Sequence, residues 1–403
     1  MSKPDQSVTP MMAQFLKIKE DHPSALLFYR MGDFYELFFD DAVAAAQALD
    51  ITLTKRGKHQ GADIPMCGVP VHAAEGYLLN LIRKGFRVAV CEQLENPQEA
   101  KKRGAKSVVK RGVVRLVTPG TLTEDTLLHP RESNFLASFV QVRNQSCLSW
   151  VDISTGDLRY SPCPPVRLGP ELARLAPAEV LVAERASNKI LEIIQECGAA
   201  ATELPKDIFD STAGADKICK AYGVGDLGGL GKFGRADIAA ISGLIEYLSA
   251  TQKGQLPLLR QPVCEAQDGF VAIDAATRKN LELTQTLSGE RSGSLLSVVD
   301  RSVTAAGARL LSRCITTPSQ RLATIEERAS AVAFFCGQSG LRGAVRSALK
   351  QLPDVERALG RVALERSGPR DLLALGSGIT QAAQVRALLA QHDLPPLLQN
   401  AAD

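Results

Sequence analysis

The pattern of apolar residues changes part-way along the chain, and this change limits the folds open to it. Before about residue 270, short apolar runs of strand length alternate with helical segments, such as residues 25–29 and then the Ala-rich residues 40–49. From about Asp274 the strand signals fade, and apolar residues recur at helical spacing with Arg or Glu opposite them. We therefore expect a multi-domain chain with mixed α/β domains first and an all-helical domain last.

Turn-forming residues divide the chain further. In the first part we predict strands at 25–29, 87–91 and 112–117, with turns marked by Gly57, Gly61, Pro65, Gly68 and Pro70. In the second part, the residue pattern predicts strands at 135–142, 148–153, 158–160 and 180–182, and helices at 189–197 and 238–250. For the third part, helices are predicted at 278–287, 295–314, 325–335 and 355–364, and a last one ends near residue 391. We place the domains at 1–117, 134–255 and 256–403, with a linker at 118–133.

Composition excludes several classes of site. The nine cysteines include no C-x-x-C pair, and the five histidines are scattered, so we expect neither a disulfide framework nor a metal site. No apolar run reaches the length of a membrane span, and the first ten residues lack the apolar core of a signal peptide. We expect a cytoplasmic protein with no membrane partner and no cofactor held by this chain.

Positive charge is concentrated in the first part of the chain. Residues 1–117 carry 17 Lys and Arg against 13 Asp and Glu, whereas the other 286 residues carry 30 against 31. The segment 101–115 contains seven basic residues and no acid: Lys101, Lys102, Arg103, Lys106, Lys110, Arg111 and Arg115. Such a run is either a solvated loop or a set of contacts with phosphates.

The sequence contains no phosphate-binding loop of the G-x-x-x-x-G-K-[ST] type. The nearest approach, residues 225–233, misses the glycine spacing by one residue and has Phe233 in place of Ser or Thr. We therefore expect no ATP hydrolysis by this chain and no catalytic residues.

The segment 30–40 is rich in aromatic residues and acids. If residues 34–38 are extended, Phe34, Glu36 and Phe38 share one side of the strand, and Tyr35 and Leu37 share the other. Taken alone, this pattern is typical of an aromatic core strand with one solvated acid.

A family resemblance changes that interpretation. Residues 32–38, Gly-Asp-Phe-Tyr-Glu-Leu-Phe, resemble the G-D-F-Y-E-x-F segment of the MutS family, whose F-x-E pair meets a mispaired base. Further stretches that resemble the same family follow in order at 51–57, 64–70, 88–93, 113–121, 274–283, 295–301 and 368–372. The resemblance covers essentially the whole chain.

The resemblance implies a mismatch-binding α/β domain, an RNase H-like connector domain and part of a helical core. It assigns Phe34 and Glu36 to a mispaired base, and Arg56, with Lys55 beside it, to the DNA backbone. The basic run at 101–115 is assigned to the backbone on charge alone. The implied partners are duplex DNA with mismatches or small loops and a MutL-type repair protein.

The family's clamp and nucleotide-binding domain, which uses ATP and magnesium, are expected to be missing here. The family's main dimer contacts lie in the missing half, so we expect weak dimerisation or none. Two alternatives stay open. Asp152 lies where RNase H-like nucleases keep a metal-binding acid, so the chain could be a metal-dependent nuclease. It could also be a non-repair paralogue that binds branched DNA.

Overall fold

The computed structural model describes residues 9–59, 61–103, 107–265 and 269–402. The chain divides into two compact units. The first comprises residues 1–122 and 247–255, and the second comprises residues 123–246 and 256–403. Within the described residues, no helix is both long enough and apolar enough to cross a membrane.

The first unit contains a six-stranded mixed sheet with the order β3-β4-β2-β1-β5-β6. Its strands are β1 (Leu26–Met31), β2 (Phe34–Phe38), β3 (Thr54–His59), β4 (Ala62–Pro70), β5 (Val88–Gln93) and β6 (Arg111–Val117). β1 and β5 are parallel, and the other neighbouring strands are antiparallel. The predicted strands at 25–29, 87–91 and 112–117 are confirmed as β1, β5 and β6.

Helices cover both faces of this sheet, which explains why its central strands are apolar on both sides. The helices are α1 (Pro10–Glu20), α2 (Phe39–Leu49), α3 (Ala74–Arg83) and α4 (Pro97–Lys102), with a 3₁₀ turn η1 (Val71–Ala73). Phe15 of α1 packs edge-on against Phe38 and Tyr29 on one face. On the other face, the buried Cys67 donates a hydrogen bond to the Ala42 carbonyl of α2.

One part of the sheet was predicted wrongly. Pro65, Gly68 and Pro70, which we expected to mark turns, lie within β4. This strand is paired on both sides, with β2 and with β3. Pairing with two neighbours overrides the local preference of proline and glycine for turns.

The second unit begins with another six-stranded sheet, of order β11-β10-β7-β8-β9-β12. Its strands are β7 (Phe135–Val142), β8 (Gln145–Asp152), β9 (Asp157–Pro162), β10 (Glu179–Ala183), β11 (Ala200–Leu204) and β12 (Val263–Cys264). β7, β8 and β9 form an antiparallel meander, and β10 and β11 add parallel strands beyond β7. This is the strand order of an RNase H-like sheet, as expected from the sequence.

Helices pack on this sheet and bury Trp150, Leu148 and Ile194 in its core. They are α5 (Leu168–Leu175), α6 (Asn188–Glu196), α7 (Ser211–Tyr222) and α8 (Arg235–Thr251), with 3₁₀ turns η2 (Pro165–Arg167), η3 (Lys206–Phe209) and η4 (Leu227–Gly229). The predicted helices at 189–197 and 238–250 are confirmed as α6 and α8.

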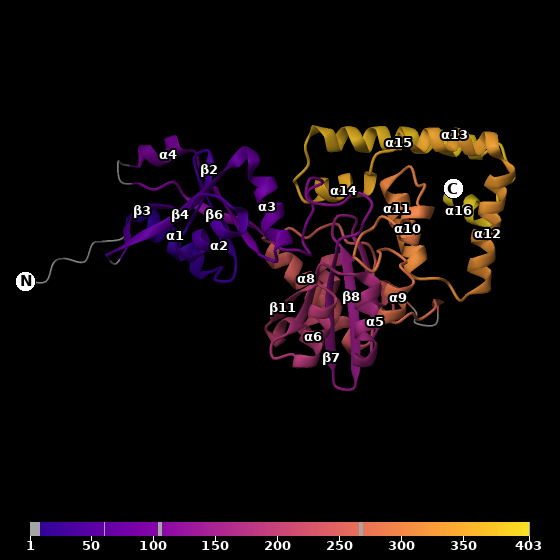
Figure 1. Ribbon diagram of the computed structural model, residues 1–403, viewed down its shortest axis with the longest axis horizontal. Helices are drawn as coiled ribbons and strands as arrows, with labels where there is room; N and C mark the ends of the chain where they lie inside the picture. The colour runs from indigo at the N-terminus through magenta and orange to yellow at the C-terminus, as the bar shows by residue number, and fades with distance from the viewer. Residues whose placement is uncertain (1–8, 60, 104–106, 266–268, 403) are drawn as a thin grey trace, which may run out of the picture. The chain divides into compact units, whose positions relative to one another are not determined.

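The chain is mainly helical after residue 274. The helices are α9 (Ala275–Asn280), α10 (Leu295–Val299), α11 (Ala305–Thr316), α12 (Leu322–Gly337), α13 (Ser339–Leu349), α14 (Val355–Ala363), α15 (Pro369–Leu389) and α16 (Pro396–Ala402). The long helix α15 lies against α13 and α14 (Figure 1). The helix predicted at 295–314 is instead two, because residues 300–304 leave the helix and Thr304 caps α11. The helix predicted at 278–287 ends early, at Asn280.

Arginines of these helices hold the chain just before β7. Arg357 is 2% exposed and donates to the carbonyl oxygens of His129 and Glu132 at 3.1 and 2.7 Å. Arg309 donates to the carbonyl of Pro130 at 3.0 Å. The end of the expected linker is therefore fixed to the helical part by hydrogen bonds to its backbone.

Candidate nucleic-acid interface

Phe34 is uncovered at the start of β2. The tight connection from β1 passes through Gly32, whose φ of +62° suits glycine, and β2 begins at Phe34. Phe38 lies on the same face of the strand but is only 1% exposed, because α1 covers it, whereas Phe34 is 48% exposed. A large apolar ring at this exposure is available to a ligand.

Glu36 lies between these two phenylalanines on that face and is half-buried. Its partner across the sheet is Gly68 of β4, which has no side chain to cover it. A Cβ atom at Gly68 would lie 3.8 Å from Cγ of Glu36 and 3.9 Å from Cδ1 of Phe34. The sequence did not single out Gly68 as a site residue, although an isolated glycine within a strand often marks a close approach.

Arg56 reaches Glu36 from β3, with β4 between the two strands. Its Nη1 atom forms an ion pair with Oε2 of Glu36. A register shift in the β3–β4 pairing falls between Lys55 and Lys58, and Gly57 there has a φ of +74°. Such bulges change the direction of a side chain relative to a regular strand. Lys55 instead pairs with Asp63 at 3.0 Å.

The basic run does not form one uniform surface. Lys102 and Lys110 are exposed, while Arg103 pairs with Glu95. Arg111 stacks over the ring of Tyr29 and donates to the Arg30 carbonyl at 2.7 Å, so it packs within the unit. Arg115 lies on β6. Lys106 and the side chain of Lys101 lie outside the described residues.

Asp152, the residue behind the nuclease alternative, is 2% exposed at the end of β8. Its carboxylate accepts hydrogen bonds from the Asn134 N–H, the Ser154 N–H and the Ser154 hydroxyl, at 3.2, 3.0 and 2.6 Å. Burial raises the pKa of this carboxyl. Across the part of the chain that the structure describes, no cluster of three or more His, Cys, Asp or Glu is arranged to hold a metal ion.

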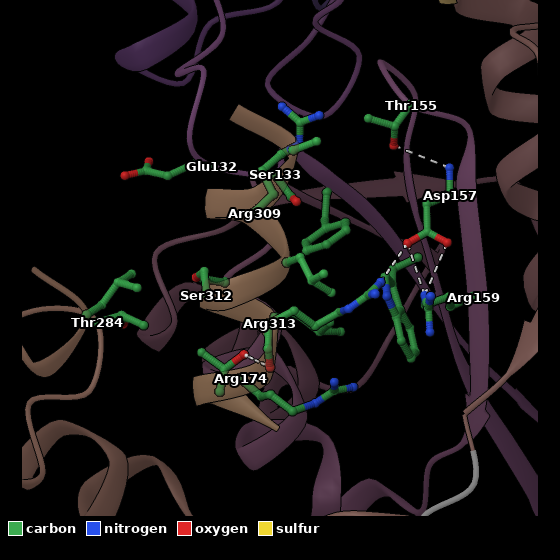
Figure 2. Close-up of a pocket in the computed structure, with 18 of the residues that line it drawn as sticks. Glu132, Ser133, Thr155, Asp157, Arg159, Arg174, Thr284, Arg309, Ser312 and Arg313 are labelled. Atoms are coloured by element: carbon green, nitrogen blue, oxygen red, sulfur yellow. Dashed lines mark hydrogen bonds and ion pairs between the residues drawn. The ribbon is translucent and has the colours of Figure 1, made fainter. Parts of the chain in front are cut away.

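A cavity of about 540 Å³ lies within the second unit (Figure 2). Asp157 and Arg159 of β9 lie on one side, facing Arg313 of α11, and both arginines contact the Asp157 carboxylate. All six arginines that line the cavity pair with acids; the other four are Arg174, Arg260, Arg291 and Arg309. The polar wall of the cavity is thus internally neutralised.

The glycine-rich stretch at 225–233 does not have the surroundings of a phosphate-binding loop. It lies between α7 and α8 rather than after a strand, and the Asp226 carboxylate already accepts from the Gly228 N–H. An acid in that place repels phosphate. These residues do not fit a nucleotide.

The order of the parts defines a multi-domain class: a mixed α/β domain, then an RNase H-like domain, then a helical region. Family models match each part in turn: MutS domain I at residues 9–126, MutS domain II at 134–260 and MutS domain III at 276–402. The chain belongs to the MutS family and comprises domains I to III.

Curated relatives agree with this assignment. The chain is 59% identical to the DNA mismatch repair protein MutS of Roseobacter denitrificans over 395 residues, which is 98% of this chain and 45% of the relative. It is 61% identical to the protein of that name from Dinoroseobacter shibae, over 97% of this chain and 44% of the relative. The chain therefore spans less than half the length of these bacterial relatives.

Proposed function

We propose that this chain recognises mispaired or looped-out bases in duplex DNA and so initiates mismatch repair. The observation that carries the proposal is the exposed ring of Phe34 beside Glu36, on the same face of β2 in domain I. Relatives about 60% identical over nearly the whole chain are DNA mismatch repair proteins, which supports the same function.

The proposed mechanism tests how easily the duplex deforms. The minor groove presents a degenerate hydrogen-bond pattern, so a mismatch is hard to identify there by reading base edges. Phe34 acts as an apolar wedge that unstacks one base step. Unstacking costs a few kcal/mol, and the cost is smaller where pairing is already defective. The wedge therefore enters preferentially at a mismatch.

Glu36 adds a second discrimination. A carboxylate near phosphates is repelled unless it gains a specific hydrogen bond. A displaced, mispaired base offers that hydrogen bond, whereas a stacked pair does not, so the acid penalises binding to paired DNA.

Basic side chains hold the DNA backbone without reading its sequence. We assign this role to Lys55 and Arg56 on β3, and to the run comprising Lys101, Lys102, Arg103, Lys106, Lys110, Arg111 and Arg115. Among these, the exposed Lys102 and Lys110 are the best supported, because Arg103 and Arg111 contact other groups of domain I.

The two alternatives receive less support. A nuclease needs several carboxylates converging on metal ions, whereas the Asp152 carboxylate accepts hydrogen bonds from its own turn. A paralogue that binds branched DNA would lack the F-x-E pair, and Phe34 and Glu36 are both present. In the longer family proteins, we propose a MutL-type protein and a second copy of the chain as partners.

The test compares Phe34→Ala and Glu36→Ala on paired and singly mismatched duplexes at one salt concentration. Phe34→Ala removes a stacking contact worth roughly 1–3 kcal/mol that forms only where the step opens, so mismatch binding should weaken far more than homoduplex binding. Glu36→Ala should leave homoduplex affinity unchanged or higher while discrimination falls. An unchanged ratio of mismatch to homoduplex affinity in both variants would contradict the proposal.

A further inference from the structure

Two side chains with separate proposed contacts on DNA are bonded to each other in this structure. Glu36 is the acid proposed to meet the mispaired base, and Arg56 is a cation proposed to meet the backbone. Nη1 of Arg56 forms a hydrogen-bonded ion pair with Oε2 of Glu36. Neither group can take up its contact with DNA fully while this ion pair persists.

We propose that Arg56 is a specificity-determining residue that stays paired with Glu36 on paired DNA and releases it only at a mismatch. On a homoduplex the closed pair offsets part of the repulsion between the carboxylate and the phosphates, so the protein can scan the duplex. At a mismatch Glu36 exchanges Arg56 for the displaced base, and Arg56 turns to a phosphate. The inference rests on the function proposed above for Glu36.

Local geometry suits a contact that exchanges. The bulge at Gly57 turns Arg56 out of the regular β3 ladder, so its direction does not depend on a strand partner. The Arg56 side chain is 44% exposed and that of Glu36 is 14% exposed. The pair uses one terminal nitrogen of a guanidinium that carries five N–H donors. A phosphate can therefore approach Arg56 from solvent while Glu36 stays close to the wedge.

The strengths of the contacts also favour exchange. A partly exposed ion pair favours its closed form over its open form by only about two- to five-fold. A hydrogen bond from a base to a desolvated carboxylate is stronger, because one partner is charged and water is excluded. A displaced base can thus replace Arg56. A stacked base offers Glu36 no donor, so the ion pair stays closed.

A double-mutant cycle tests whether the pair opens. The affinities of the parent chain, Arg56→Ala, Glu36→Ala and the double variant are measured by fluorescence anisotropy on a homoduplex and on a duplex with one G·T mismatch. The cycle cancels each residue's own contacts with DNA and retains the change in their mutual interaction on binding. We expect an unfavourable coupling of about two- to five-fold on the mismatch and none on the homoduplex.

Two results would overturn the inference. Zero coupling on both duplexes means that the pair never opens, and equal coupling on both means that any DNA opens it. The matched control is the Lys55→Ala and Asp63→Ala cycle, because that pair joins β3 to the neighbouring strand β4 at 3.0 Å and should give equal coupling on both duplexes. Phe34→Ala is measured in parallel. If it lowers the mismatch-to-homoduplex ratio while the Arg56–Glu36 cycle shows no difference, only the inference fails; if it leaves the ratio unchanged, the proposed function fails.

Discussion

Arg103 places both terminal nitrogens of its guanidinium on the carboxylate of Glu95, each 2.5 Å from one oxygen. The backbone N–H of Lys110 donates to the same carboxylate at 2.6 Å. A bidentate contact of this kind fixes the relative orientation of the two groups more closely than a single hydrogen bond does. It ties residues 103 and 110 of the basic run to one acid.

The first prediction concerns the ionisation of Glu95. Hydrogen bonds from Arg103 and from the Lys110 N–H lower the pKa of Glu95 to about 2 from its usual 4.5. Because the folded pKa is lowered, this contact stabilises the fold above about pH 4.5, and the contribution is lost as the pH falls towards 2. In Arg103→Ala, a carboxyl NMR titration should show the pKa of Glu95 rising towards 4.5. A pKa that stays near 2 would mean that Arg103 is not its partner in solution.

The second prediction concerns salt dependence. Each phosphate contact releases counterions, so affinity falls as salt rises. Lys102→Ala should make the negative slope of log affinity against log salt shallower by about 0.9. Arg103→Ala should change the slope less than Lys102→Ala does, because the Arg103 guanidinium also pairs with Glu95, and it should lower affinity mainly by exposing that acid. Adding Glu95→Ala should restore the affinity of Arg103→Ala and should not rescue Lys102→Ala.

Neutralising Lys101, Lys102 and Arg103 together should weaken binding to all duplexes alike. A change confined to mismatch preference would contradict the backbone assignment.

The third prediction uses the open space at Gly68. In Gly68→Val the side chain would fill the space between Phe34 and Glu36 and hinder their approach to DNA, since a Cβ atom alone already comes within 3.9 Å of both. Mismatch binding should fall more than homoduplex binding, with the thermal unfolding temperature nearly unchanged because valine favours strands. Gly68→Ala is the control and should have a small effect. Equal ratios for Gly68→Val and the parent would show that this space is not used.

The fourth prediction concerns the buried Arg357. Arg357→Met keeps much of the volume but leaves the carbonyls of His129 and Glu132 without this donor. The free energy of unfolding of the second unit should fall by about 2–4 kcal/mol in urea titrations. The exposed Arg328 on α12 provides a matched control, and Arg328→Met should change stability by less than about 0.5 kcal/mol. Equal effects of the two substitutions would contradict the role of Arg357.

Apolar runs were sufficient to predict most strands of the fold, because burial of those runs forms the sheets. Residues 135–142 were predicted as a strand and form β7 with the same bounds. The errors occur where a distant partner decides the local structure. Asp300 interrupts the helix predicted at 295–314, and its carboxylate pairs with Arg131 at 2.7 Å, far away in the sequence. A local pattern of apolar residues contains no information about such a partner.

The candidate site was predictable to a similar extent. A period of two placed Phe34 and Glu36 on one side of a strand, and β2 has that alternation. The Arg56–Glu36 pair could not be predicted, because it depends on the β3-β4-β2 order and on the bulge at Gly57. Gly68 was interpreted as a turn, and its place opposite Glu36 emerged only from the strand register.

The arginine contacts before β7 also bear on how this segment tolerates sequence change. Arg309 and Arg357 bond to main-chain oxygens of Pro130 and His129, and every amino acid carries that oxygen. The amino acids at positions 129 and 130 can therefore differ among homologous chains without loss of these hydrogen bonds. The two arginines cannot be replaced as freely, even by lysine, because lysine lacks the planar guanidinium group with which one arginine side chain binds two acceptors.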